Sequence, residues 1–326
     1  MKKVKTINVT KKFEDKNLGF SRLELKLKGE DIDNIITNSI KRIVQTDIPI
    51  FSFSEINITD NTSIFNNNYV KDHVRNIPVW GIENNLEEYY KKEIIPEEDF
   101  SESRGIIDDD IELTVDNKMD TSALNELNMY VEYKNNSKEI YAVTTDDAEF
   151  HYQEGLIKSP YYNPIQLVKL QPGQEIKIDA RAKLGTEEIS GIFSATNVCF
   201  FIQNEKDYDF IIESRGQIKE RRILLLALKI LNKKLRHFYD NLPKNKGMEG
   251  TIIVENEDHT LGNIITKGMQ NHSSVQFCGY NTPHPLKKEI HFHYKLNSGN
   301  INTVVKEVII YYETIFNDLI EKIKKV

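Results

Sequence analysis

The chain is 326 residues long, with 39% hydrophobic and 29% charged residues and a net charge of -7. This length and apolar content suffice for two or three compact units, each with its own core. Proteins that bind DNA without sequence preference neutralise phosphates with Lys and Arg, so an acidic chain is not expected to hold DNA by itself. We expect contact with DNA only through partner proteins.

The cysteine content and the lengths of the apolar runs narrow the class of protein further. Cys199 and Cys278 are too few for a disulfide scaffold and half of what a four-thiolate zinc site requires. Residues 1–13 lack the apolar stretch of a signal peptide, and the longest apolar run, at 223–228, is too short to span a bilayer. We therefore expect an intracellular chain with no cofactor and no membrane role.

The first elements in chain order are a strand at Phe20–Leu27, a helix with apolar residues at helical spacing from Ile32 to Val44, and a strand at Phe51–Thr59. A long helix at about Gln217–Tyr239 closes this part of the chain. Its apolar residues fall at coiled-coil-like spacing: Leu224, Leu228, Leu231, Leu235 and Phe238.

The segment at about 81–168 differs in composition, being richer in Tyr, Asn and acidic residues. Strand-like runs at Asn128–Tyr133 and Ile140–Thr145 predict a small inserted β-rich domain, with an irregular segment at 84–110. Because the segment contains no cysteine, we expect packing or a partner to stabilise it. Residues 242–247 follow a helix and combine a proline with flexible polar residues, which predicts a linker.

After this linker the chain repeats the same order of elements. A strand at Thr251–Val254 leads to a helix that starts near Asp258, then to a strand at Glu289–Leu296 and a closing helix at about Ile301–Ile323. The apolar stripe of this last helix consists of Val304, Val305, Val308, Tyr312, Ile315, Leu319 and Ile323. Each stripe is too extensive for one α+β half to cover alone, so we expect the two closing helices to bury one another.

Two motifs carry most of the information in the second part: EDHTLGN at 257–263 and FCGYNTPHPL at 277–286. Asp258 and Thr260 suit a helix N-cap, and Gly262 permits another backbone to approach the helix closely. Neither motif holds a nucleophile with its base. We expect the histidine at 259 to make a capping contact or a hydrogen bond across the fold. Structural roles are expected for all the motif residues: Asp258, His259, Thr260, Leu261, Gly262, Asn263, Phe277, Gly279, Tyr280, Pro283, His284 and Pro285. Gly279 suits a bulge or a close approach, and the two prolines suit an edge or a bend.

These motifs and the helix that follows them closely resemble the eleventh subunit of eukaryotic RNA polymerase II and the archaeal L subunit, over residues 248–326. The first part is similar to the pairing partner of that subunit. Residues 31–49 resemble the first helix of the third polymerase II subunit, the archaeal D subunit and the bacterial alpha subunit, and residues 170–185 (LQPGQEIKIDARAKLG) and 213–218 (ESRGQI) resemble later motifs of the same family.

The resemblance implies an α+β fold in which two alpha-type dimerisation units are fused in one chain. The first unit is expected at 1–80 and 169–241, the inserted domain at 81–168, the linker at 242–247 and the second unit at 248–326. The helices of the internal dimer should pack through Leu224, Leu228, Leu231, Leu235, Val304, Val308, Tyr312 and Ile315.

A noncatalytic assembly role follows from the same resemblance. The chain would dock the second-largest and largest RNA polymerase subunits, with small zinc-containing subunits alongside, while catalysis belongs to the whole complex. Asn38, Lys41 and Arg42 match the part of the first helix that faces the second-largest subunit in this family; alternatively, Lys41 and Arg42 are simply its solvent side. In many archaeal and eukaryotic relatives the inserted segment holds cysteines for a metal site, but residues 81–168 of this chain contain none. Together with the fusion and the Asn/Ile/Lys-rich composition, this suggests a large DNA virus, with the protein acting in a cytoplasmic factory, in the virion or in a nucleus.

Other chemistry stays open as an alternative. A two-metal site could be formed by Asp108, Asp109 and Asp110, and a zinc site by His284, His291 and His293. Either site would suit a free-standing metal-dependent nucleic-acid enzyme. We favour a solvated acidic loop and a partly exposed strand surface for these residues, and so expect no catalytic or metal-binding residues. A third alternative is an interaction protein that acts outside a polymerase.

Overall fold

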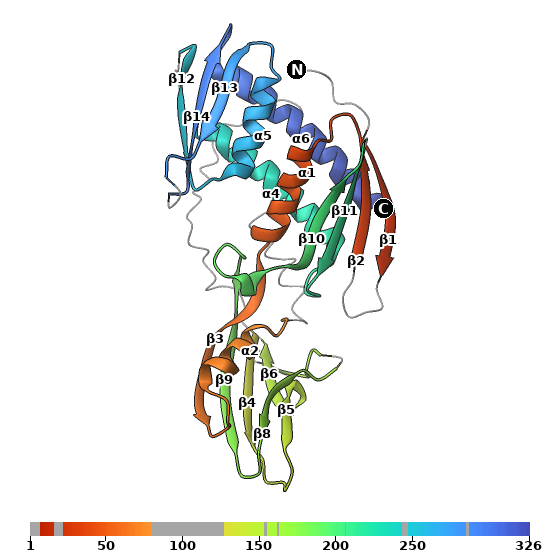
Figure 1. The fold of residues 1–326 in the computed structure, drawn as a ribbon, viewed down its shortest axis with the longest axis vertical. Coiled ribbons are helices and arrows are strands. Elements are labelled where there is room, and N and C mark those ends of the chain that lie inside the picture. Colours follow the sequence, from red (N-terminus) through yellow and green to blue (C-terminus); the bar gives the residue numbers. More distant parts are fainter. Residues whose placement is uncertain are drawn as a thin grey trace. The chain divides into compact units, whose positions relative to one another are not determined.

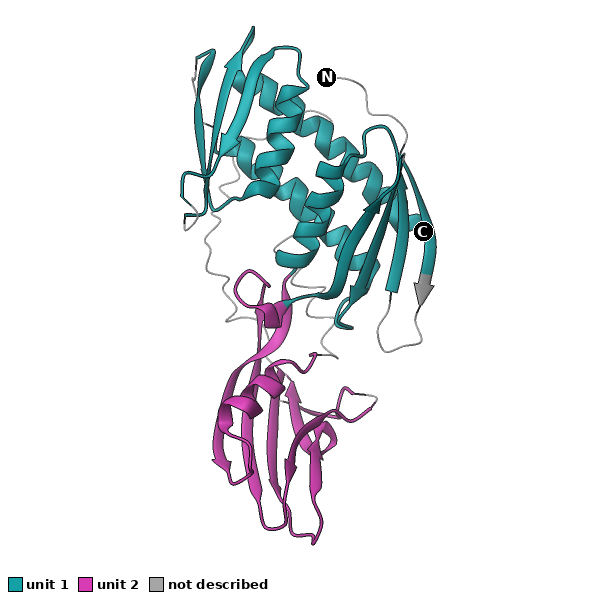
Figure 2. Cartoon of the chain, viewed as in Figure 1, with its two compact units in different colours: residues 1–48, 194–326 teal, residues 49–193 magenta. Residues whose placement is uncertain are grey.

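The computed structural model describes residues 7–15, 22–79, 127–152, 155–161, 163–205, 207–242, 247–284 and 287–326. The chain divides into two compact units (Figure 2). Unit 1 comprises residues 1–48 and 194–326, and unit 2 comprises residues 49–193. The part of the chain that follows residue 246 therefore belongs to the same compact unit as the N-terminal strands. We call residues 1–48 and 194–242 the first half of unit 1 and residues 247–326 its second half.

The first half of unit 1 is a four-stranded antiparallel sheet with two helices. In chain order its elements are β1 (Asn8–Asp15), β2 (Arg22–Lys28), α1 (Asn34–Thr46), β10 (Thr196–Gln203), β11 (Asp207–Ser214) and α4 (Glu220–Asp240). The order of strands is β1-β2-β11-β10. Helix α1 begins where the Asp33 side chain accepts a hydrogen bond from the Ile36 amide at 2.9 Å. The predicted strand-to-helix corner at 213–218 is confirmed, and Gly216 takes the left-handed conformation there with φ of 93°.

The second half repeats this plan without a counterpart of β1. Its elements are β12 (Glu249–Glu255), α5 (His259–Gln270), β13 (Val275–Asn281), β14 (Glu289–Leu296) and α6 (Ile301–Lys325). The sheet order β12-β14-β13 matches β2-β11-β10 strand for strand, and both are antiparallel throughout. The predicted repetition of strand, helix, strand and closing helix is confirmed, but the third element of the first half is β11 and not the predicted strand at 51–59, and β10 and β13 were not predicted. In the observed plan β2, α1, β10, β11 and α4 correspond to β12, α5, β13, β14 and α6.

Unit 2 is built mainly from strands. Its elements are β3 (Ile50–Asn61), α2 (Asn67–Arg75), β4 (Leu127–Lys134), β5 (Tyr141–Thr144), β6 (Ala148–Tyr152), β7 (Gly155–Ile157), β8 (Gln166–Leu170) and β9 (Glu175–Gly185), with short 3-10 helices η3 (Thr145–Asp147) and η4 (Gly191–Phe193). A five-stranded sheet has the order β3-β9-β4-β6-β7, and β5 pairs with β8.

The structure corrects the predicted division of the chain. The strand expected at 51–59 exists as β3, but it pairs along its length with β9, which also pairs with β4. These shared hydrogen bonds place β3 and β9 in the same unit as β4, and α2 belongs with them because it packs on β3 and β8. The compact insert therefore runs from Pro49 to Phe193 instead of 81–168. The counterpart of β14 in the first half is β11, not β3. The 84–110 segment, with Asp108–Asp110, lies outside the described residues.

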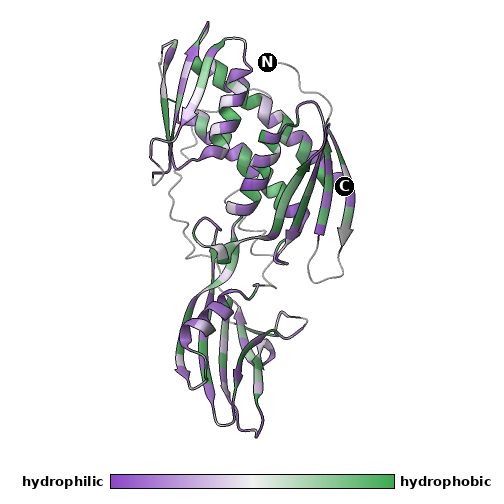
Figure 3. Cartoon of the chain, viewed as in Figure 1, coloured by the Kyte–Doolittle hydropathy of each residue, from purple (hydrophilic) through white to green (hydrophobic). Residues whose placement is uncertain are grey.

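The helices of unit 1 lie between its two sheets (Figure 1). Helix α4 packs against α6 and α1, and α5 packs against α1 and α6. Hydrophobic residues alternate with polar ones on the strands and recur along the helices (Figure 3). All eight side chains expected in the internal helix interface are at most 3% exposed: Leu224, Leu228, Leu231, Leu235, Val304, Val308, Tyr312 and Ile315. Among the described residues, no helix is both long enough and apolar enough to cross a membrane.

Candidate functional site

The start of the EDHTLGN motif lies where the two halves of unit 1 meet. Asp258 is the N-cap of α5, as predicted, and its carboxylate accepts from the Thr260 amide at 2.7 Å. Arg42 on α1 reaches the same point: its Nε donates to Thr260 Oγ1 at 2.7 Å and its Nη2 to Asp258 Oδ2 at 2.5 Å. Burial works to raise the pKa of Asp258, but the hydrogen bonds from Thr260 and the Arg42 guanidinium outweigh it and hold the pKa below its usual value.

The residue before this N-cap is the buried member of an ionic cluster. Lys234 Nζ lies 3.2 Å from Glu257 Oε2 and 3.2 Å from Asp47 Oδ2. Glu257 is only 7% exposed, while the side chains of Lys234 and Asp47 are half-buried, at 25% and 22%. Burial raises the pKa of Glu257 to about 7, against the attraction of Lys234. Although burial works to lower the pKa of Lys234, the two carboxylates raise it. We call Lys234, Glu257 and Asp47 the buried triad; it joins α4, the start of α5 and the C-cap of α1.

Polar and aromatic contacts continue along the two long helices. Arg236 Nε donates to Glu313 Oε1 at 2.5 Å, and one turn away the Asn232 amide donates to Asn317 Oδ1 at 3.1 Å. Phe238 on α4 packs on a ring of the other half, Phe292 on β14, with centroids 5.1 Å apart. The contacts show that α4 and α6 run antiparallel at their crossing.

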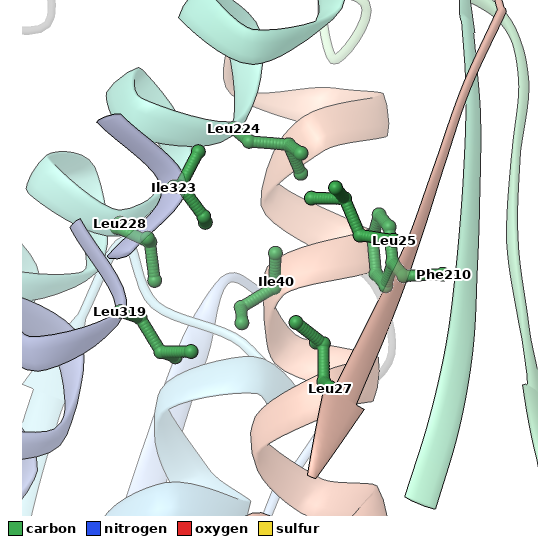
Figure 4. A pocket seen from close by; sticks show the side chains of 8 residues that line it. All are labelled: Leu25, Leu27, Ile40, Phe210, Leu224, Leu228, Leu319 and Ile323. Carbon is green, nitrogen blue, oxygen red and sulfur yellow. The ribbon is translucent and has the colours of Figure 1, made fainter. Parts of the chain in front are cut away.

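Between these helices and the first sheet lies a small apolar cavity. Side chains from β2, α1, β11, α4 and α6 point into it (Figure 4): Leu25, Leu27, Ile40, Phe210, Leu224, Leu228, Leu319 and Ile323. Both halves contribute to the lining, and no polar group faces a ligand there. The cavity is a gap in the shared core, so it supports packing between the halves and no binding of a small molecule.

The two motifs of the second half contact each other. The His259 ring is hydrogen-bonded through Nδ1 to the Tyr280 hydroxyl at 3.1 Å, a contact across the fold as expected. The Tyr280 ring also lies on Gly262, where an added Cβ would sit 2.6 Å from its Cε2. The close approach predicted at Gly262 is therefore made by an aromatic ring and not by a backbone.

The remaining motif residues are spread over α5 and β13. Leu261 is buried, Asn263 is exposed, and Phe277 is 57% exposed. Gly279 pairs with His293 in regular register, while the bulge of β13 falls between Val275 and Phe277. Pro283 follows the end of β13, which is an edge strand, in line with its expected position, and His284 is exposed. Pro285 lies outside the described residues.

The residues expected to dock a large subunit lie on α1, and all three are half-buried: Asn38, Lys41 and Arg42. Arg42 is engaged by Asp258 and Thr260, so its guanidinium contributes to the contact between the halves. Lys41 lies near β10, where its charge works against the burial that raises the pKa of Cys199 to about 12. Of the three, Lys41 is the cation that no described contact ties to the second half.

The histidines considered for a metal site have other neighbours. His293 is hydrogen-bonded to Thr251 Oγ1 at 3.0 Å and to Asn281 Oδ1 at 2.8 Å. His291 lies 3.6 Å from the Glu289 carboxylate on the same strand. Within the described part of the chain, no group of three or more His, Cys, Asp or Glu side chains could hold a metal ion.

Sequence reasoning missed the buried triad and the α4–α6 polar pairs. One signal was present: Lys234 falls between Leu231 and Phe238 on the apolar stripe of α4, and Glu257 opens the EDHTLGN motif. A lysine within an apolar stripe requires a buried carboxylate, which the motif supplies.

Unit 1 thus has the architecture of a dimerisation protein, with two copies of one α+β plan joined through their helices. Residues 249–322 match the family model described as the RNA polymerase Rpb3/Rpb11 dimerisation domain. The predicted resemblance to the alpha-type assembly subunits of RNA polymerase is confirmed, and so is the α+β fold class that it implied.

Similarity to one curated protein extends over nearly the whole chain. The chain is 27% identical over 328 residues to a putative DNA directed RNA polymerase subunit R470 of Acanthamoeba polyphaga mimivirus, covering 93% of this chain and 90% of that protein. It is 39% identical over 70 residues to the probable RPAC2 subunit of RNA polymerases I and III of Caenorhabditis elegans, and 32% identical over 81 residues to the probable RPB11 subunit of Plasmodium berghei. These two matches cover 49% and 64% of the relatives and 21% and 22% of this chain.

Proposed function

We propose that this chain is a noncatalytic assembly subunit of a multisubunit DNA-directed RNA polymerase, in which the two partners of an alpha-type dimer are halves of one chain. The observation that carries the proposal is the pairing within unit 1. A second half that matches the dimerisation-domain family is packed, helix on helix, against a first half with the same strand order. Similarity over 93% of the chain to a viral polymerase subunit supports the same function.

Fusion changes the thermodynamics of such a dimer. Joining two partners by a short linker holds the second at an effective concentration of about millimolar, so pairing does not depend on the concentration of separate subunits. The linker also fixes one copy of each partner per assembly. The chain can therefore present a completed dimer to the next subunit as soon as it has folded.

The partners are proposed by resemblance: the second-largest and largest polymerase subunits, with small zinc-containing subunits alongside and DNA reached only through the complex. Lys41 on α1 is the cation best suited to meet an acidic surface of the second-largest subunit, with Asn38 beside it. Arg42 serves the pairing of the halves and positions α1. We propose that the source is a large DNA virus, in line with the mimivirus relative.

Affinity purification of tagged chain from the native source tests the proposal. The large polymerase subunits should co-purify in equal amounts with wild-type chain. A Lys41→Glu variant should lose the second-largest subunit, because charge reversal opposes an acidic partner, while the matched variant Lys306→Glu, an exposed lysine on α6, should retain it.

Three results would contradict the proposal. Recovery of the chain without any large subunit would favour an interaction protein that acts outside a polymerase. Metal-dependent cleavage or synthesis of nucleic acid by the purified chain alone would favour the enzyme alternative. Equal recovery of the second-largest subunit with Lys41→Glu at low salt would place the docking surface elsewhere.

A further inference from the structure

The two halves can be aligned residue by residue from their own structure. Asp33 and Asp258 are the N-caps of α1 and α5, so Ile32 corresponds to Glu257. By the same register Arg42 corresponds to Lys267, and Asp47 to His272. The alignment of the remaining helices follows from their contacts.

Helices α4 and α6 cross as antiparallel partners, with Asn232 opposite Asn317 and Arg236 opposite Glu313. A pseudo-twofold axis that relates the two halves exchanges α4 with α6. It carries the pair Asn232–Asn317 onto the pair Glu313–Arg236 if Asn232 corresponds to Glu313 and Arg236 corresponds to Asn317. This register also superimposes buried residues on buried residues: Leu224 on Val305, Leu231 on Tyr312 and Leu235 on Phe316. It places Lys234 on Ile315.

The buried triad breaks this symmetry. Lys234 corresponds to Ile315, and Glu257 corresponds to Ile32; both isoleucines are buried. In a pair made of two second halves, the Glu257 carboxylate would face Ile315 of the other copy in place of Lys234. The place of Asp47 would be taken by His272, which is bound to Glu307 of its own half. In a pair made of two first halves, Lys234 would face Ile32 in place of Glu257 but would keep Asp47.

We propose that the contact between Lys234 and Glu257 biases which halves pair, favouring a first half with a second half over two second halves. A buried carboxylate that loses its lysine is strongly unfavourable, whereas an isoleucine loses nothing by facing another apolar side chain. Two first halves are disfavoured less, because each Lys234 keeps Asp47 of its own half as a partner. The inference rests on the pairing of the halves and not on polymerase membership.

The contact between Arg42 and Asp258 supplies a natural contrast. Its counterparts are Lys267 and Asp33, which carry the same signs of charge, so a cation would meet an N-cap aspartate in every combination of halves. That contact can stabilise pairing, but it does not select a partner. A variant of Arg42 is therefore the matched control.

The test uses the full chain after cleavage between Lys244 and Gly247, with the complexes identified by native mass spectrometry at equilibrium. Cleavage is needed because the intact linker keeps the two halves of one chain together at about millimolar effective concentration, whichever halves are compatible. The double variant Lys234→Ile, Glu257→Ile gives each half the residue of the other half at both positions. A buried ion pair replaced by packed apolar residues is often tolerated, so the variant should fold, and after cleavage complexes of two second halves should appear beside the mixed pair. Cleaved wild type and cleaved Arg42→Met should show the mixed pair and no complex of two second halves. A folded double variant that shows only the mixed pair, as wild type does, would overturn the proposal.

A second experiment keeps the proposal falsifiable if the double variant fails to fold. Lys234→Glu and Glu257→Lys each place like charges together within one chain. In a mixture of the two, the glutamate introduced in one chain can meet the lysine introduced in the other, and the unchanged Lys234 and Glu257 form a second contact between the chains. The mixture should give a complex with one copy of each variant, at least tenfold more abundant than either self-dimer. Equal amounts of mixed and self-dimers, or no mixed dimer, would contradict the assigned role.

Discussion

The two halves of unit 1 differ most at the connection between their first helix and their next strand. In the second half, α5 ends at Gln270 and β13 begins at Val275, so four residues make the turn. In the first half the corresponding connection, from α1 to β10, contains the whole of unit 2. The helices and strands on either side nevertheless keep the same order. A connection at the edge of a paired core tolerates a large insertion because the insert brings its own sheet and its own core.

The largest effect is expected from charges placed in the shared helix core. Leu231→Asp or Val308→Asp should each cost about 3–5 kcal/mol, because an unpaired carboxylate would be buried between α4 and α6. If the halves depend on each other equally, both variants should abolish cooperative unfolding in a thermal melt. The control is Ile310→Asp on the same helix, where the side chain is 51% exposed and the change should be about 0.5 kcal/mol.

A smaller loss of stability is expected from substitution of a single glycine of α5. A Cβ on Gly268 would lie 2.7 Å from Tyr312 Cε2 and would also contact Val308. Glycine is normally unfavourable in a helix interior, so Gly268→Ala in an isolated helix would stabilise by about 1 kcal/mol. Here the same change should destabilise by about 1–3 kcal/mol in urea unfolding, because α6 cannot move away. Unchanged or increased stability would show that α5 and α6 are less closely packed.

The buried triad predicts a pH dependence that the other contacts do not share. A carboxyl group whose pKa rises on folding, as that of Glu257 does to about 7, favours the folded state in its protonated form. Its contribution is complete below the ordinary value near 4.5 and is lost as the pH rises through 7. Relative to Glu257→Gln, the unfolding free energy of wild type should therefore fall by on the order of 1–3 kcal/mol between pH 4.5 and pH 8. Parallel pH profiles for the two proteins would contradict this.

The smallest effect is expected from removing unit 2. Replacing residues 49–193 with the four residues Asn271–Ser274 leaves eight residues between α1 and β10, a short connection like the four-residue one between α5 and β13. Because unit 1 has its own core, the far-ultraviolet circular dichroism should remain that of a folded α+β protein, with a melting temperature within about 5 °C of the wild-type transition of unit 1. Loss of that transition would show that unit 1 depends on the insert.

Local sequence patterns predicted β2, β12, β14 and the four helices of unit 1, but not β10 or β13. The alternation in Glu289–Leu296 gave β14 with its observed bounds, and Asp258 gave the start of α5. Local patterns did not predict which unit an element belongs to when that depends on the strand or helix with which the element pairs. β3 was recognised as a strand, but only its pairing with β9 shows that it belongs to unit 2. β1 was missed because Asn8, Thr10 and Lys11 leave an edge strand with little alternation.

The same distinction between local and distant contacts holds for the residues of the candidate site. Motif spacing indicated the N-cap, and a hydrogen bond across the fold was one of the two roles expected for His259, although its partner Tyr280 was not predicted. Both contacts lie within one half. The roles of Arg42, Lys234 and Gly268 depend on side chains far away in the sequence or on another helix. No local pattern shows that Arg42 meets Asp258, so Arg42 was assigned to docking while the structure engages it between the halves.

The central claim is that one chain contains a complete intramolecular dimer, and cutting its linker tests this most directly. A protease site introduced between Lys244 and Gly247 would separate the two halves covalently and leave the contacts of α4 with α6 intact. After cleavage the two fragments should co-elute in size-exclusion chromatography as one complex of one copy each. Fragments that separate and remain folded on their own would contradict the account.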